Sequence, residues 1–393
     1  MPNAIVVSFA LSLMTVASCQ QTAKRWILSE PEQLLITQAH FAGALYPIET
    51  AEQIFALPAH TKTELTTLLT SHQDINERSI AIVEYILSHT GKTFLYNLAT
   101  TKTASDTLTT RQANCLSLSI LTYSIAREIG LNATFQNVSI PEFWSSQLNQ
   151  TWLNGHINVR LQQPQHDAAS DLIIPDGEII IDFDPDVTKQ QFATEAISSQ
   201  RVVAMFYNNK AAEAFDNFNY ALTYRYYRAA IAADPDYAVT WSNLAVLYRQ
   251  HHFIELAEQT YHHSLALDPT AANTMANLAV LYRLTGNNND AEKLEQLVYE
   301  KRKMNPWYYL MLGTEALNRN LPDHAIDLFK QALALDAQMH QAFSGLASSY
   351  LALNDNLSAI YYLTLSKQAA ISMTDKKRYD GKIRALNHFA GSG

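Results

Sequence analysis

The stretch from Tyr237 to Pro269, YAVTWSNLAVLYRQHHFIELAEQTYHHSLALDP, decides the fold of the C-terminal half of this 393-residue chain. It can be laid on a second stretch that begins at Asn273, NTMANLAVLYRLTGNNNDAEKLEQLVYEKRKMNP. From about residue 202 onward the sequence resembles itself at a period of 34 residues. A period of this size predicts a repeat array, in which each helical hairpin buries its apolar face only by stacking on its neighbours.

The residue types that recur are those of a tetratricopeptide (TPR) repeat. Large, apolar, small, aromatic, small, aromatic and proline residues occupy, in this order, Trp241, Leu244, Ala245, Tyr248, Ala257, Tyr261 and Pro269. The chain therefore resembles TPR proteins over residues 202–370, where we expect an all-α solenoid of about five repeats, followed by a capping helix at 374–388. Pro306 comes three residues late in the pattern, which predicts a second helix about one turn longer in that repeat.

The TPR resemblance implies a function in protein binding. TPR arrays usually present a concave groove to a peptide or a partner protein. Asn243 and Asn277 occupy a helix position that hydrogen-bonds the carboxylate of a bound peptide in some members of the family. The resemblance makes these two asparagines candidate peptide-binding residues, and the alternative is that they are solvated or locally capped polar side chains.

The first residues, MPNAIVVSFALSLMTVASCQQ, have the features of an export signal. Their apolar stretch of about fifteen residues is long enough for a signal peptide and short for a membrane-spanning helix. The segment Val16 to Cys19 resembles the lipoprotein box of bacteria, which implies a signal peptide of residues 1–18 and a lipid on Cys19. We therefore expect a lipid-anchored protein of the bacterial envelope, at the periplasmic face of the outer membrane, with an ordinary signal peptide as the alternative.

The composition narrows the class of protein further. Hydrophobic residues make up 48% and charged residues 17% of the chain, which is typical of a folded protein and not of a disordered one. The net charge is -9 and no basic cluster is large enough to bind a phosphate backbone, so nucleic acid is not an expected partner. No ligand spacing predicts a metal site or an organic cofactor, so neither is expected. The final GSG, residues 391–393, is expected to be an expression scar.

Residues 107–185 switch from a helical period to a strand period. Asn114 is a good N-cap for a helix from Cys115 to Ile129. Segments of alternating apolar residues then predict strands at 133–140, 156–161 and 178–183. The predicted order is a helix led by a cysteine, a strand that begins with His156 and a strand that carries Asp182.

This order resembles the transglutaminase-like, papain-related cysteine enzymes. The stretch TLTTRQANCLSLSILTYSIAREIGLNATF resembles their nucleophile helix, GHINVRL their histidine strand and IIIDFDP their aspartate strand. The resemblance covers 107–185 and implies an α+β papain/transglutaminase-like domain within residues 19–200. A loop flanked by Trp144 and Trp152 is expected either to cover the site or to pack locally.

The resemblance also implies a role for each candidate site residue. Cys115 would be the nucleophile, His156 the base and Asp182 the carboxylate that orients the base, with His166 and Asp184 as alternatives for the last two. These residue types suit the chemistry, because a helix N-terminus stabilises a thiolate and an imidazole can take the thiol proton while a carboxylate fixes its tautomer. The backbone N–H of Cys115 is expected to face the developing oxyanion.

Two functions follow from these features. The first is an envelope lipoprotein whose Cys-His-Asp site acts on amide bonds of a protein or peptide, by hydrolysis or acyl transfer, while the TPR array recruits the substrate or a partner. The second is a non-catalytic TPR scaffold or assembly lipoprotein with a degenerate transglutaminase-like domain. The reactivity of the Cys115 thiol in the folded protein distinguishes the two.

Overall fold

The structure is a computed structural model that describes residues 30–37, 40–41, 47–71, 74–90, 95–96, 100–110, 112–147, 150–162, 178–183 and 192–390. The predicted signal peptide with Cys19, the alternatives His166 and Asp184, and residues 391–393 lie outside these ranges, so the predictions for them stay predictions. No helix in the described part of the chain is long and apolar enough to cross a membrane.

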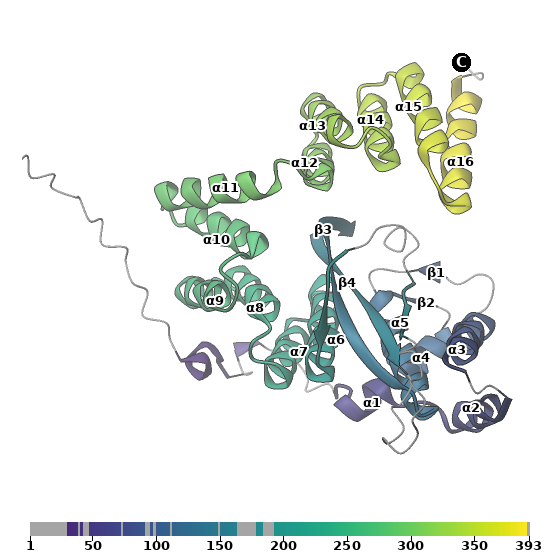
Figure 1. Cartoon of the computed structure of the whole chain (residues 1–393). Helices are drawn as coiled ribbons and strands as arrows, with labels where there is room; N and C mark the ends of the chain where they lie inside the picture. The colour runs from purple at the N-terminus through teal and green to yellow at the C-terminus, as the bar shows by residue number, and fades with distance from the viewer. Residues whose placement is uncertain are drawn as a thin grey trace, which may run out of the picture.

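The N-terminal region is built around a small antiparallel sheet with helices beside it (Figure 1). In the described residues this sheet has four strands in the order β5-β4-β3-β6, namely β3 (Asn132–Gln147), β4 (Gln150–Gln162), β5 (Glu178–Ile181) and β6 (Thr194–Ile197). The helices are α1 (Ala51–Phe55), α2 (Ala59–Ser71), α3 (Ile75–Thr90), α4 (Ala104–Thr110) and α5 (Cys115–Glu128), preceded by a 3-10 helix, η1 (Pro31–Leu34). Two short strands, β1 (Leu95–Tyr96) and β2 (Gln112–Ala113), pair in parallel just before α5.

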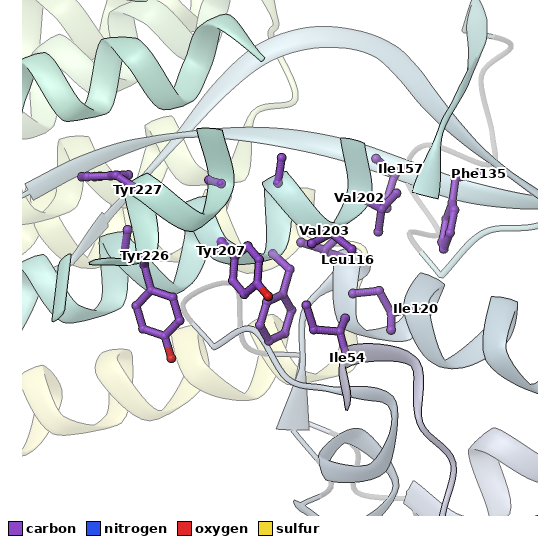
Figure 2. Close-up of a cluster of buried hydrophobic side chains, with 14 of the residues drawn as sticks. Ile54, Leu116, Ile120, Phe135, Ile157, Val202, Val203, Tyr207, Tyr226 and Tyr227 are labelled. Atoms are coloured by element: carbon purple, nitrogen blue, oxygen red, sulfur yellow. The ribbon is translucent and has the colours of Figure 1, made fainter. Parts of the chain in front are cut away.

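Helix α5 lies against the sheet, has a defined start and end, and is buried on nearly all sides, with ten of its 14 residues buried. The side-chain oxygen of Asn114 accepts the N–H of Ser117 at 2.9 Å, which caps the first turn. Gly130, just beyond the last turn, has a φ of 76° and ends the helix. The buried cluster between α5 and the sheet includes Leu116, Ile120, Phe135 and Ile157 (Figure 2).

Strands β3 and β4 form a hairpin that is longer than the sequence predicted. Trp144 pairs with Leu153 and Trp152 pairs with Ser145, so the prediction of a loop between the two tryptophans is wrong. The pairing stops at Val138 and resumes at Phe143, where aromatic residues favour a strand. The register shifts once, between Val138 and Phe143.

From Ser199 to Ala390 the chain is helical and forms five hairpins and a terminal helix (Figure 1). The hairpins are α6 (Ser199–Asp216) with α7 (Tyr220–Ala233), α8 (Ala238–Gln250) with α9 (Ile254–Leu267), α10 (Ala272–Leu284) with α11 (Asn288–Arg302), α12 (Pro306–Asn318) with α13 (Pro322–Leu335), and α14 (His340–Ala352) with α15 (Asn356–Ala369). Helix α16 (Met373–Ala390) packs on α15. This all-helical region, called the array below, matches the predicted TPR solenoid.

The period of 34 is also present in the backbone of the array. The turn inside each hairpin contains one residue in the left-handed region, with φ between 58° and 78°. These residues stand 34 apart, at Phe218, His252, Gly286, Asn320 and Asn354. A left-handed residue after a helix reverses the chain direction and satisfies the last carbonyl groups of the helix, so every hairpin turns in the same way.

The prediction of a longer second helix before Pro306 is wrong. Helix α11 has 15 residues and the equivalent helix α9 has 14. Pro306 is instead the first residue of α12, where a missing N–H costs no helical hydrogen bond. The side-chain oxygen of Asn305 accepts the N–H of Trp307 at 2.9 Å and caps this helix.

Phe329 fixes the spacing of three helices in the C-terminal part of the array. Its ring is 1% exposed on α13 and lies between Gly313 of α12 and Gly345 of α14. A Cβ atom would lie 2.6 Å from the ring at Gly313 and 2.5 Å from it at Gly345. Only glycine at both positions lets the neighbouring helices approach the ring this closely.

The first repeats complete the hydrophobic core of the N-terminal region. One buried cluster runs from Leu34 to Ala291 and includes Val202 and Val203 of α6 beside α5 (Figure 2). The hydroxyl of Tyr248 in α8 donates to the carbonyl oxygen of Leu34 at 2.8 Å, although the two residues are 214 apart in the chain. The sheet, α5 and the first three hairpins therefore share one core.

Candidate active site

Cys115 is the first residue of α5, and its side chain is half-buried. Its Sγ donates to the carbonyl oxygen of Gly155 in β4, with 3.9 Å between the two atoms. The first N–H groups of a helix have no acceptor within the helix, so this end of α5 presents donors to an anion beside the thiol.

The N-cap of α5 is tied to the first helix of the array. Asn114 is 4% exposed, and its Nδ2 donates to Oγ1 of Thr101 at 2.8 Å. Asn209 of α6 donates to the same oxygen at 3.2 Å, and Glu213 of α6 accepts the backbone N–H of Thr101 at 2.5 Å. The buried residue Thr101 therefore links the start of α5 to α6 by hydrogen bonds.

His156 and Asp182 form a buried pair beside Cys115. The imidazole Nε2 of His156 lies 2.9 Å from both carboxylate oxygens of Asp182. The two side chains are only 2% and 6% exposed. The sequence prediction thus named three residues that the fold brings together, from the start of α5, from β4 and from the end of β5.

The surroundings of His156 determine its protonation. Burial is the largest influence and opposes the charged imidazolium, but the hydrogen bonds with Asp182 and Cys115 and the charges of both groups outweigh it and raise the pKa of His156 to about 10. The charged imidazolium is therefore the form of His156 that lies beside the thiol at neutral pH. With Nε2 bound to Asp182, Nδ1 is the ring nitrogen left for the thiol.

Asn158 belongs to this cluster and was not predicted from the sequence. Its Nδ2 donates to Oδ2 of Asp182 at 3.2 Å, and its side chain is 4% exposed. Its Oδ1 is buried and has no hydrogen-bond partner among the described residues. Asn158 stands two residues after His156 on the same strand, so the strand period was a signal that could have identified it.

The arrangement suits nucleophilic attack on a carbonyl carbon. A thiol, an imidazole and a carboxylate are the groups that such an attack uses, and the carboxylate of Asp182 holds the imidazole of His156. The residues that the structure describes contain no group of three His, Cys, Asp or Glu side chains arranged to hold a metal ion.

The two candidate peptide-binding residues of the array have contacts within the array itself. Nδ2 of Asn243 donates to Oδ1 of Asn208 at 3.0 Å. The backbone carbonyl of Asn277 accepts from Arg249 at 3.3 Å. Asn209, which stands 34 residues before Asn243, contacts Thr101 of the N-terminal region. This position is therefore used for internal contacts at the start of the array, and a ligand at Asn243 and Asn277 stays a prediction.

Comparison with known proteins assigns no family. No protein-family model and no curated protein matches the chain. Among solved structures, the MamA protein is 16% identical over 42% of this chain and 91% of its own, with a TM-score of 0.25. PilF of Pseudomonas aeruginosa is 17% identical over 48% and 89%, with a TM-score of 0.30. TTC0263, a TPR protein of Thermus thermophilus, is 17% identical over 45% and 97%, with a TM-score of 0.31.

Proposed function

We propose that this chain is a TPR protein-interaction scaffold that carries a transglutaminase-like cysteine site, acting on amide bonds of a protein or peptide by hydrolysis or acyl transfer. The observation that supports the site is the buried pair of His156 and Asp182 with the thiol of Cys115 beside it. The observation that supports the scaffold is the array, because stacked helical hairpins present extended surfaces to other proteins.

The proposed reaction uses only groups of this chain. The thiolate of Cys115 attacks the amide carbon, and the oxyanion that forms lies near the first N–H groups of α5. The imidazolium of His156 gives its proton to the leaving amine, the C–N bond breaks and a thioester remains on Cys115. His156 then takes a proton from water or from a second amine as that molecule attacks the thioester, and the C–S bond breaks to release the Cys115 thiolate beside the imidazolium. Asp182 keeps the ring oriented throughout.

A second candidate function is a scaffold without chemistry, in which the cysteine domain keeps its fold alone. The hydrogen bond from Cys115 to the carbonyl oxygen of Gly155 favours this alternative, because it gives the thiol a structural partner. The array functions in the same way in both candidates. Only the reactivity of Cys115 separates them.

Alkylation with iodoacetamide tests the site directly. The chain has two cysteines, so a Cys19→Ser variant reports on Cys115 alone. A free thiol with a pKa of about 8.5 is only about 0.3% thiolate at pH 6. We expect the folded protein to be alkylated at pH 6 at least about tenfold faster than the unfolded protein, and His156→Ala to remove this advantage. A Cys115 that reacts only after denaturation would establish the scaffold without chemistry.

The proposal includes a lipid on Cys19, which rests on the sequence from Val16 to Cys19. Such a lipid would place the site at the periplasmic face of the outer membrane. Mass spectrometry of the protein purified from membranes should find the acylated cysteine at the mature N-terminus. An unmodified Cys19, or cleavage at another residue, would contradict this part of the proposal.

A further inference from the structure

The register shift in β3 lies opposite the candidate active site. Val138 pairs with His156, and the next paired residues are Phe143 and Asn154. Four residues, Ser139 to Glu142, therefore face the single residue Gly155, whose carbonyl accepts the Cys115 thiol. This segment is called the bulge below. The parts of β3 before and after the bulge pair with β4 in different registers. The conformation of the bulge therefore fixes the positions of Gly155 and His156 on β4.

The bulge is held by the array, from a point far along the chain. Nε of Arg302, at the end of α11, donates to Glu142 at 2.7 Å, and a second guanidinium nitrogen donates to its other carboxylate oxygen at 3.0 Å. The side chain of Arg302 is only 3% exposed. A buried guanidinium needs a partner, since removing one member of a buried ion pair leaves an uncompensated charge. Glu142 is thus fixed in position by two charge-assisted hydrogen bonds.

Neighbouring residues reinforce the same contact. Nδ2 of Asn305 donates to the backbone carbonyl oxygen of Glu142 at 2.7 Å. The guanidinium of Arg302 lies 4.8 Å from the ring centroid of Trp144, within the range of a cation–π interaction. The ring of Phe143 lies 5.7 Å from that of Trp307 in α12. On the sheet side, the bulge has a backbone hydrogen bond from Ser139 to Ala193 at 2.8 Å.

We propose that Arg302 is a positioning residue for the cysteine site: the array fixes the bulge through Glu142, and the bulge fixes Gly155 and His156 opposite Cys115. This inference rests on the function proposed above. Arg302 touches no reacting atom, and its effect passes through β3 to β4. Without Arg302, Glu142 loses its contact with α11, and the strand pairing on either side of Gly155 loses this anchor.

The test compares Arg302→Met with Arg283→Met, both in the full chain with Cys19→Ser. Arg283 pairs with Glu295 at 2.6 Å on neighbouring helices of the array, but this pair is exposed and its partners lie within the array, so it is the matched control. We expect Arg302→Met to slow alkylation of Cys115 at pH 6 about tenfold, and to shift the pH profile of the rate toward the profile of a free thiol. Amide exchange at residues 139, 140, 142 and 154–157 should quicken in the same variant. Arg283→Met should change neither measurement.

Three outcomes separate the inference from the proposed function. An inert wild-type thiol would overturn both, because there would be no reactive site to position. A reactive wild-type thiol with an unchanged pH profile in folded Arg302→Met would overturn the positioning role alone. If Arg302→Met does not fold, Glu142→Gln replaces it, because its amide oxygen still accepts one hydrogen bond from Arg302. That variant should give a smaller shift of the same profile, and no shift would overturn the positioning role.

Discussion

Replacing Asp182 with Asn tests the buried pair on which the candidate site depends. The substitution keeps the size of the side chain and removes its charge. In the folded protein the carboxylate lies 2.9 Å from Nε2 of His156 and accepts from Asn158 at 3.2 Å. An amide in this place leaves the buried imidazole without its counter-charge. Burial then dominates, and His156 should be neutral near pH 7.

The size of the effect follows from the raised pKa. The difference between a pKa of 6.5 and one of about 10 corresponds to about 5 kcal/mol at about 1.4 kcal/mol per pKa unit. Cys115 contributes part of this difference, so the share of Asp182 is smaller. Breaking a buried ion pair by removing one partner generally costs about 3 to 5 kcal/mol. We therefore expect Asp182→Asn to lower the free energy of unfolding by about 3 kcal/mol at pH 6.

The loss should depend on pH with a definite sign. Because folding raises the pKa of His156, the pair stabilises the folded protein fully below about pH 6.5, and this stabilisation is lost as the pH rises through about 10. Urea unfolding followed by tryptophan fluorescence, at several pH values from 6 to 10.5, should show the difference between the wild-type protein and Asp182→Asn shrinking. Glu300→Gln, which removes an exposed pair with Lys303, is the control and should cost less than about 1 kcal/mol. A difference that stays constant across this range would refute the ion pair.

Two further predictions concern the array. Gly345→Ala should destabilise the C-terminal repeats by about 1 to 2 kcal/mol, because its Cβ would meet the Phe329 ring at 2.5 Å. In a Phe329→Ala background the ring is gone, and the same change should instead stabilise the helix. A double-mutant cycle in thermal unfolding measures this difference. His252→Gly should raise the free energy of unfolding by about 0.5 to 1 kcal/mol, and Gly286→Ala should lower it by about 1 kcal/mol, because both residues have positive φ. Urea unfolding measures both changes, and effects of the same sign would contradict this reason.

The array could be predicted from the sequence because its contacts are local. A repeat of 34 residues places Trp241, Leu244 and Tyr248 on one helix face, and stacking buries that face in the same way in each unit. The prediction of a longer helix before Pro306 is wrong because a proline can either follow the end of a turn or begin a helix. The choice depends on Asn305 and the packing around it. The period alone does not contain that information.

The cysteine site could be predicted in part because some of its residues leave a local signal. Asn114 caps the cysteine helix, and the alternating run that begins at His156 marks the inner half of β4, although the strand itself begins at Gln150. The geometry brings Cys115, His156 and Asp182 together, whereas their catalytic roles stay predictions. Contacts between distant segments leave no such signal.

The residues missed in the sequence illustrate this limit. In the sequence, Arg302 is one of several charged residues of a polar helix. In the structure its side chain is buried against Glu142, which stands 160 residues earlier. The sequence also predicts a shorter hairpin of β3 and β4 than the structure has, because the outer half of the hairpin pairs without a clear alternation of apolar and polar residues. Such pairings are decided by the tertiary packing of the array.

The hydrogen bond from Tyr248 to Leu34 has a consequence for the order in which the protein is made. A chain that grows at about 5 to 20 residues per second adds the 214 residues between these two partners in roughly ten to forty seconds. During this time the N-terminal region exists without the helices that close its core. Until the first repeats are synthesised, the early segments lack part of the core that buries them, so they stay unfolded or bound to other proteins. The core on which α5 packs is therefore completed only after more than half of the chain has been synthesised.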